Sequence, residues 1–315
     1  MTTAPDQHRN GHVPAPDLPD RLRAVRGVVF DIDGCLVLGD KPGGHGGRAL
    51  PGAVDAVAAI RATGRPVVAF TNGSSQVPAD IAAGLRLQGF DLADDEVLTP
   101  AVVAAEVLAE RYGDQPVLVF AGPGLVDVVA AAGVVLADPD RPTDAAAVLV
   151  GWDVGFTRDR LQAAAEAIWN GAPMLVASDA RRFASASKPM AGVGGFIAQG
   201  LSYVTDTEYE VLGKPSDTAM LVAARRLGVA PADVLVAGDD LRLEVSMARR
   251  AGGVGVLVTT GVHGRVPVGE IAADQMPDLV VDALSELSAR MLLADATASD
   301  PVNAPTALPA DRVGA

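Results

Sequence analysis

The strongest constraint on the fold of this 315-residue chain is the alternation of short, continuous apolar runs with amphipathic segments. Runs rich in strand-forming residues stand at 27–33, 65–73, 233–240 and 253–261. Between the first two runs, Val54, Val57 and Ile60 recur at helical spacing before a stop at Gly64. Continuous apolar strands joined by such helices predict a parallel sheet covered by helices on both faces, and therefore an α/β fold.

The middle of the chain carries a strand and helix pattern of its own. Residues 114–210 contain three further apolar runs and an amphipathic segment. We therefore predict that this part is a second α/β domain, inserted into a core domain that comprises residues 22–113 and 211–293. The proline-rich and charged ends, residues 1–21 and 294–315, predict disordered tails.

Charge and composition limit the classes of partner. The formal net charge of −14 repels DNA and RNA backbones, so we expect no nucleic-acid partner. A small anionic substrate is still compatible with it, because such a ligand responds to the local field of its pocket and of any bound metal. Apolar residues make up 49% of the chain, which is enough for a large core.

The cysteine, histidine and hydropathy patterns exclude several other kinds of site and segment. The single cysteine, Cys35, rules out an internal disulfide and a cysteine-rich zinc site, and the four histidines have no metal-ligand spacing. Cys35 has no evident cationic partner, which favours a packed side chain over a reactive thiol. No signal-peptide pattern and no bilayer-length apolar run is evident, so we expect a cytoplasmic protein without a membrane partner.

Polar side chains gather where the core strands end. In a parallel sheet, ligands bind beyond the carboxyl ends of the strands, so we expect these residues to converge on one site. They are Asp31, Asp33, Thr71, Asn72 and Asp239 at strand ends, with a backbone N–H at Gly73, and Lys214 just ahead of a predicted helix.

This set of groups suits phosphoryl transfer. A carboxylate can attack phosphorus, and a divalent cation held by oxygen ligands relieves the repulsion between the two anions. A lysine and hydroxyl or backbone donors can stabilise the charge on the phosphoryl oxygens. A second acid can protonate the leaving group and later activate water.

Each motif alone has a simpler interpretation. The aspartates of "DIDG" could end a strand in a solvated turn, and Lys214 could be an ordinary lysine at the start of a helix that we expect from Pro215. Thr71 and Asn72 could turn the chain, and Asp240 fits a first-turn acid that complements a helix dipole. Only the convergence of all these motifs at one sheet edge favours catalysis.

Four segments in order, "FDIDG", "FTNGSS", "GKPS" and "AGDDLRLE", resemble the four motifs of the haloacid dehalogenase superfamily. The domain inserted between the second and third motifs resembles the C2a cap of class IIA, the branch that includes NagD and the nucleotide, phosphoglycolate, pyridoxal phosphate and para-nitrophenyl phosphate phosphatases. The resemblance covers nearly everything between the two tails. It implies a Rossmann-like parallel-sheet core with an inserted α/β C2-type cap.

The resemblance also implies a metal site. Asp31 matches the nucleophile and a Mg²⁺ ligand, and Asp33 matches the general acid/base, with its main-chain carbonyl as a second ligand. Asp239 matches a further carboxylate ligand. The last motif commonly ends in aspartate, whereas this chain has Glu244, which we expect to reach a metal-bound water and to tune metal affinity.

Further residues match phosphate and substrate contacts. Thr71 matches the hydroxyl that binds the phosphoryl group, with Asn72 and Gly73 as neighbouring donors. Lys214 matches the lysine that steadies nucleophile and phosphate. In the cap, the segment "SDARRF" aligns with the part that faces the active site, which makes its charged residues candidates for specificity. These are Asp179, Arg181 and Arg182.

The resemblance implies a Mg²⁺-dependent phosphatase that hydrolyses a small phosphate monoester through an aspartyl-phosphate intermediate. A non-catalytic phospho-ligand sensor and a phosphotransferase or phosphomutase on the same scaffold are alternatives. The expected partner is a small phosphorylated metabolite of the sugar, nucleotide, glycolate or glycerol phosphate type, and a homodimer through the cap is compatible with the family. The glycine-rich insert around His45 lengthens the loop after the first motif, where it could alter access to the site.

Overall fold

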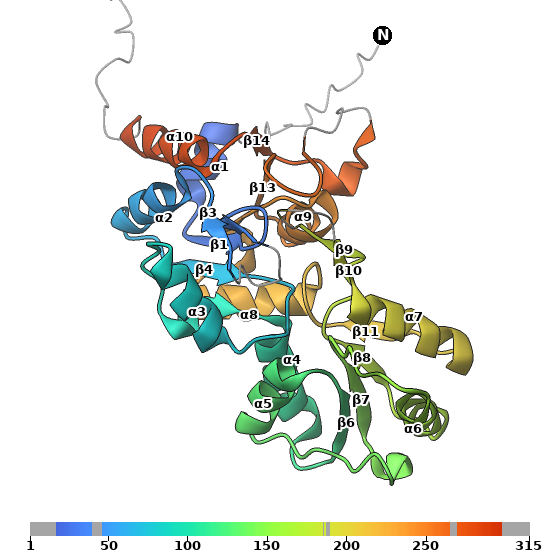
Figure 1. Cartoon of the computed structure of the whole chain (residues 1–315). Coiled ribbons are helices and arrows are strands. Elements are labelled where there is room, and N and C mark those ends of the chain that lie inside the picture. Colours follow the sequence, from blue (N-terminus) through green and yellow to red (C-terminus); the bar gives the residue numbers. More distant parts are fainter. Residues whose placement is uncertain (1–16, 40–45, 185, 187–189, 265–269, 298–315) are drawn as a thin grey trace, which may run out of the picture.

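The core of the molecule is a six-stranded parallel sheet (Figure 1). The computed structural model describes residues 17–39, 46–184, 186, 190–264 and 270–297. The core strands, in the order β14-β13-β12-β1-β4-β5, are β14 (Leu279–Val281), β13 (Val254–Val258), β12 (Val234–Gly238), β1 (Gly27–Asp31), β4 (Val67–Phe70) and β5 (Val97–Leu98). Every residue of the four central strands is buried, because helices cover both faces.

Two groups of helices enclose this sheet. One face is covered by α1 (Leu18–Ala24), α2 (Ala53–Ala62), α3 (Pro78–Leu87) and α10 (Leu284–Ala296). The other is covered by α4 (Pro100–Tyr112), α8 (Asp217–Leu227) and α9 (Ser246–Arg250). Helix α8 begins at Asp217 and not at the predicted Pro215, because Ser216 Oγ caps it by accepting the Ala219 N–H at 3.0 Å.

The inserted unit has a parallel sheet of its own, in the order β11-β8-β7-β6. Its strands are β6 (Val117–Phe120), β7 (Ala147–Val150), β8 (Met174–Val176) and β11 (Tyr209–Val211). Helices α6 (Arg158–Trp169) and α7 (Val193–Thr205) pack on one face, and α5 (Pro123–Ala131) packs with α4 on the other. The predicted domain boundary after residue 210 falls inside β11, because this strand pairs with β8 through Val211.

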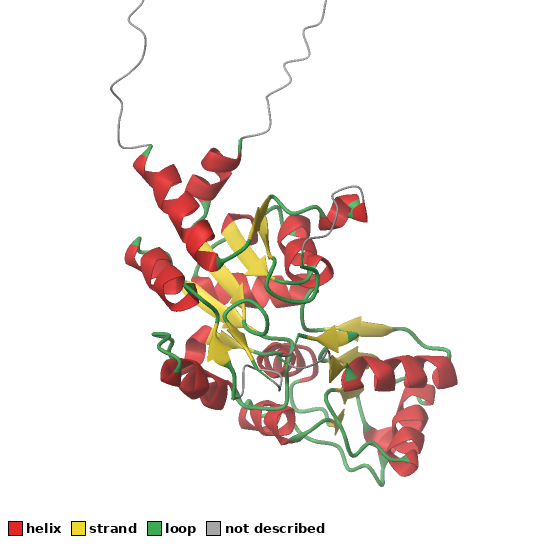
Figure 2. Cartoon of the chain, turned by 45° about the horizontal axis from the view of Figure 1, so that its top comes forward, coloured by secondary structure: helices red, strands yellow, loops and turns green. Residues whose placement is uncertain are grey.

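Short elements complete the structure (Figure 2). Two antiparallel hairpins consist of β2 (Val37–Leu38) with β3 (Arg48–Ala49) and of β9 (Arg182–Phe183) with β10 (Met190–Ala191). The short helices are η1 (Asp94–Glu96), η2 (Pro142–Asp144), η3 (Pro231–Asp233), η4 (Leu241–Val245, a π-helical turn) and η6 (Ala273–Gln275). Across the described ranges, each helix is too short or too polar to traverse a bilayer. These elements confirm the α/β fold class, with a Rossmann-like core and an inserted cap.

Both predicted disordered tails, 1–21 and 294–315, include residues that are helical in the structure. Helix α1 already begins at Leu18, where the prediction placed disorder up to residue 21, and its Leu22 is buried. At the other end α10 continues past residue 293, and the Arg65 guanidinium binds both carboxylate oxygens of Asp295 at 2.7 and 2.8 Å. The prolines and charged residues at the chain ends obscure the helical pattern in the sequence. The two helices form because they pack against each other. Residues 1–16 and 298–315 lie outside the described residues.

A truncation series tests whether the end of α10 belongs to the folded core. A chain that ends at residue 293 loses Asp295 and leaves the Arg65 guanidinium, which is 11% exposed, without its carboxylate. We expect its free energy of unfolding to fall by about 2 kcal/mol in urea denaturation. A chain that ends at Thr297 retains all of α10 and serves as the matched control, so equal stabilities of the two chains would contradict the expectation.

Candidate active site

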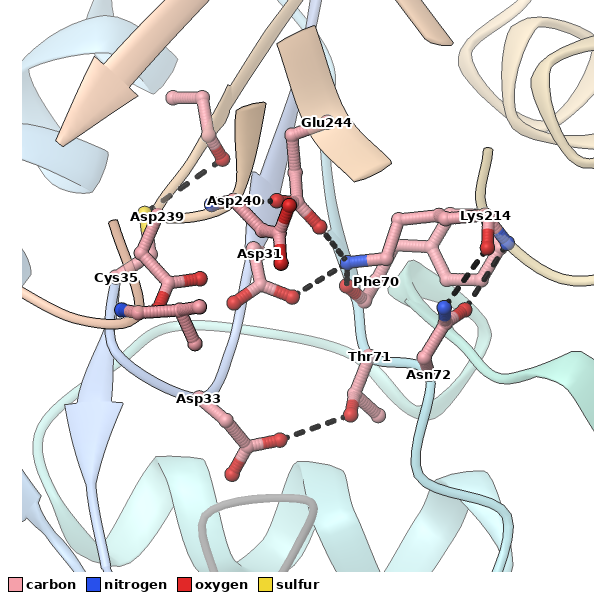
Figure 3. Close-up of polar contacts among 12 residues, drawn as sticks. Asp31, Asp33, Cys35, Phe70, Thr71, Asn72, Lys214, Asp239, Asp240 and Glu244 are labelled. Atoms are coloured by element: carbon pink, nitrogen blue, oxygen red, sulfur yellow. Dashed lines mark hydrogen bonds and ion pairs between the residues drawn. The ribbon is translucent and has the colours of Figure 1, made fainter. Parts of the chain in front are cut away.

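The predicted site residues converge at the carboxyl edge of the core sheet (Figure 3). Strands β12, β1 and β4 are neighbours, and they end immediately before Asp239, at Asp31 and immediately before Thr71. A small pocket there is lined by both sheet-edge and cap residues: Asp31, Asp33, Thr71, Asn72, Arg182, Phe183, Ala184, Lys214, Asp239, Asp240, Leu243, Glu244 and Val262.

Lys214 is the central cation of this pocket. Its side chain is 1% exposed, and its Nζ donates to a carboxylate oxygen of Asp31, to Phe70 O at 2.7 Å and to Glu244 Oε1 at 2.7 Å. These three acceptors match the three N–H donors of an ammonium group. Burial alone would lower the pKa of Lys214, but the two carboxylates raise it above its ordinary value, so the lysine stays charged.

The backbone around Lys214 is fixed from both domains. Asn72 accepts the Lys214 N–H at 3.0 Å and donates to the Lys214 carbonyl at 2.8 Å. Just upstream, the N–H groups of Leu212 and Gly213 donate to the carbonyls of Val176 and Ala177, each at 2.8 Å, which extends the cap sheet beyond β11. Lys214 is therefore held between the core loop after β4 and the edge of the cap sheet.

Thr71 and its neighbours form a second set of contacts. Thr71 Oγ1 donates to Asp33 Oδ2 at 2.9 Å and accepts the Gly73 N–H at 2.9 Å. The amide of Asn72 is engaged with Lys214 and the N–H of Gly73 with Thr71, so both have intramolecular partners in this state. Their role as phosphate donors stays a prediction.

Buried negative charge dominates the electrostatics of the pocket. Desolvation by burial raises the pKa of Asp31 to about 6, against the lowering effect of Lys214 and with a further increase from Asp33. Burial likewise raises the pKa of Glu244 to about 7. The pKa of Asp239 is raised by burial and by the nearby Asp31 and Glu244 carboxylates. Lys214 alone does not balance these acids, so the pocket favours a further cation.

The residues present fit a Mg²⁺ ion. The carboxylates of Asp31 and Asp239 face each other in Figure 3, and the main chain of Asp33 follows two residues after Asp31. Within the described part of the chain, no three acidic, histidine or cysteine side chains form a metal-binding group. Two carboxylates with a main-chain carbonyl and water still suit Mg²⁺, which prefers oxygen ligands and retains several waters.

Two glycines make room for this arrangement. Gly34 follows Asp33 with φ +96°, and a Cβ there would lie 2.5 Å from Asp239 Oδ2. Gly238 ends β12, and a Cβ there would lie 2.1 Å from the Glu244 Cγ. Any larger residue at either position would displace an acid of the pocket.

Glu244 contacts the lysine, a role that the sequence did not indicate. Its Oε1 accepts from Lys214, and its Oε2 accepts the Asp240 N–H at 3.1 Å. The π-helical turn η4 carries it, and Asp240 caps this turn by accepting the Arg242 N–H at 2.8 Å. The expected contact with a metal-bound water stays a prediction; the extra methylene, relative to aspartate, is the one sequence signal that could have suggested a different partner.

The predicted cap residues occupy two adjoining places. Arg182 lines the pocket at the sheet edge together with Phe183 and Ala184, and it also lines a neighbouring cavity with Asp179 and Arg181. The hairpin region is tied to the core by the Ala186 N–H, which donates to Gly39 O at 2.9 Å. His45 and its flanking residues 40–44 lie outside the described residues.

Sequence reasoning missed several residues of these cavities, among them one aromatic and two basic side chains. These three are Phe183, Arg242 and Arg250. Phe183 lies within "SDARRF" and Arg242 within "AGDDLRLE", which are the signals that could have indicated them, whereas no motif contains Arg250. Cys35 fits its predicted packing role, since its side chain is buried and burial raises the pKa of its thiol.

Comparison with known proteins places this geometry in a family. Residues 28–135 match the model of haloacid dehalogenase-like hydrolases, and residues 211–287 match a second model described as HAD-hydrolase-like. The haloacid dehalogenase-like hydrolase domain-containing protein 2 of Bos taurus is 32% identical over 242 residues, which cover 76% of this chain and 86% of that protein. Chronophin of Mus musculus is 30% identical over 284 residues, which cover 86% of this chain and 94% of chronophin.

Solved structures agree with this placement. The 4-nitrophenylphosphatase of Thermotoga maritima superposes with a TM-score of 0.74 at 27% identity, covering 85% of this chain and 98% of that one. The p-nitrophenyl phosphatase of Archaeoglobus fulgidus superposes with a TM-score of 0.73 at 26% identity, and the match covers 87% of this chain and 99% of that one. With its four motifs assembled at one sheet edge beneath an inserted cap, the chain belongs to the haloacid dehalogenase-like hydrolases of class IIA and is an enzyme of the phosphatase type.

Proposed function

We propose that this protein is a Mg²⁺-dependent phosphatase that hydrolyses a small phosphate monoester through an aspartyl-phosphate on Asp31. The observation that carries the proposal is the position of the Asp31 carboxylate, buried between the Lys214 ammonium and the Asp239 carboxylate. Such a carboxylate is a usable nucleophile only when cations offset the charge of the phosphoryl group.

The side chains of the pocket divide the reaction between them. Asp31 attacks phosphorus, while Lys214 and Thr71 stabilise charge on the non-bridging oxygens. Asp33 gives its proton to the leaving oxygen and then takes one from the water that hydrolyses the aspartyl-phosphate. Bound Mg²⁺, held by Asp31, Asp239 and the carbonyl of Asp33, would reduce the repulsion between nucleophile and phosphate.

Glu244 has a distinct part in this proposal. By binding Lys214 beside Asp31, it fixes the ammonium that must contact the phosphoryl group. It therefore acts as a positioning residue for the lysine.

Replacement of the nucleophile tests the proposal. Asp31→Asn removes the attacking carboxylate, so we expect phosphate release from p-nitrophenyl phosphate to fall by at least about 1000-fold with Mg²⁺ present. EDTA should have a comparable effect on the unaltered protein. Asp159→Asn, at a side chain that is 93% exposed, is the matched control. Substantial metal-dependent turnover by the pure Asp31→Asn protein would refute the assignment.

Shortening Glu244 distinguishes a lysine contact from a metal contact. Glu244→Asp withdraws the carboxylate from Lys214, so we expect kcat at saturating Mg²⁺ to fall about tenfold or more. The Mg²⁺ concentration for half-maximal activity should stay within about twofold of the wild-type value. The reverse pattern, a large shift in Mg²⁺ requirement at constant kcat, would instead place Glu244 beside a metal-bound water.

The raised pKa values predict how pH and metal act on stability. Because the folded-state pKa values of Asp31 and Glu244 exceed their ordinary values, the stabilisation that protonation provides is complete below the unfolded-state values, near 4. It is lost as pH rises through about 6 to 7. We therefore expect the Tm increase caused by Mg²⁺ to grow across this interval, as measured by scanning fluorimetry. The increase should be smaller in Asp239→Asn protein, and a Mg²⁺ effect independent of pH would contradict the assignment.

A further inference from the structure

A larger cavity adjoins the catalytic pocket. It has a volume of about 460 Å³, within the range of small-molecule sites. Arg182, Asp240 and Leu243 line both spaces, so the cavity begins where the catalytic pocket ends. A substrate whose phosphoryl group lies against Asp31, before transfer, has this cavity beside its leaving group.

The cavity is rich in positive charge although the whole chain is strongly anionic. Arg181 and Arg182 come from the cap, Arg242 from η4 and Arg250 from α9, so segments far apart in the sequence contribute to one lining. Two carboxylates, those of Asp179 and Asp240, also line it. Asp179 lies near the Tyr209 hydroxyl, whose pKa is raised by burial and by this carboxylate, and Asp240 accepts the Arg242 N–H at 2.8 Å.

Three of the four guanidinium groups retain donors for a ligand. Neither Arg181 nor Arg182 forms an ion pair with an acidic side chain in the described ranges. The Arg242 Nε is buried without a hydrogen-bond partner among those residues, and its Nη2 lies 3.6 Å from the nearest Asp240 oxygen. Arg250 is occupied, because it binds Asp217 at 3.1 Å and the carbonyl of Pro215.

We propose that the leaving group of the physiological substrate carries a second anionic group, a carboxylate or a further phosphate, which Arg181, Arg182 and Arg242 bind in this cavity. This inference rests on the proposed phosphatase function and narrows its substrate class. Guanidinium groups bind both kinds of anion with paired hydrogen bonds, and an anion held among the three arginines that line this cavity would reduce their mutual repulsion.

A matched pair of esters tests the inference. 3-Phosphoglycerate and glycerol 3-phosphate share a three-carbon frame and differ in whether carbon 1 is a carboxylate or a hydroxymethyl group. We expect kcat/KM to favour 3-phosphoglycerate by roughly tenfold or more. A second pair, a hexose bisphosphate and the corresponding monophosphate, shows whether the preferred anion is a phosphate. If, in both pairs, the enzyme prefers the ester without the second anionic group or prefers neither ester, the inference is overturned.

Arginine variants locate the preference. Arg181→Gln and Arg242→Gln should each reduce the preference for the acidic ester by roughly tenfold. Arg158→Gln, at a cap side chain that is 84% exposed, should retain the wild-type ratio. A ratio unchanged in both cavity variants would overturn the assignment of these residues.

Binding separates this inference from the proposed function. Calorimetric titration of Asp31→Asn protein with the two three-carbon esters, in the presence of Mg²⁺, measures the preference without turnover. If the wild-type protein fails to hydrolyse every ester but this variant still prefers 3-phosphoglycerate, the phosphatase proposal falls and the anionic subsite stands. Hydrolysis of p-nitrophenyl phosphate without any preference within the ester pairs overturns only the subsite.

Discussion

The structure of the site depends on one buried ammonium group. Lys214 offsets two carboxylates that would otherwise repel each other in a desolvated pocket, and its third donor binds the main-chain carbonyl of Phe70. Its contacts join β1, the end of β4 and η4 into a single arrangement. Removal of the lysine would leave uncompensated carboxylates at the point where three core segments meet, so the lysine supports both the local fold and the proposed chemistry.

Much of the core could be predicted from the sequence because its strands are buried on both faces. The runs that contain β1, β4, β12 and β13 are uninterrupted apolar segments, and parallel pairing then requires their polar ends to meet at one edge. The convergence of Asp31, Thr71 and Asp239 followed from this topology alone. Lys214 was recognisable because a cation just before a helix N-terminus is unfavourable without an anionic partner.

The sequence was least informative where tertiary contacts decide the outcome. Helix α1 and the last turn of α10 are short segments with many polar residues. They are stabilised by the packing of α1 on α10 and by contacts such as that of Arg65 with Asp295. The partner of Glu244 depends on the π-helical turn and on the space above Gly238, neither of which has a sequence period. Arg242 and Arg250 belong to the cavity because η4 and α9 lie beside the segment that leads from the cap back to the core, whose Val211, Pro215 and Ser216 also line the cavity.

The connection from the cap sheet into Lys214 has a consequence for how such enzymes diversify. Only Leu212 and Gly213 separate β11 from the lysine, and both continue the hydrogen bonding of the cap sheet. A cap exchanged by recombination must therefore preserve the register of its last strand, since a one-residue slip would shift the lysine by more than 3 Å. Loops elsewhere in the cap are free of this restriction, so new specificities can arise by insertion near β9 and β10 while the junction at β11 changes little.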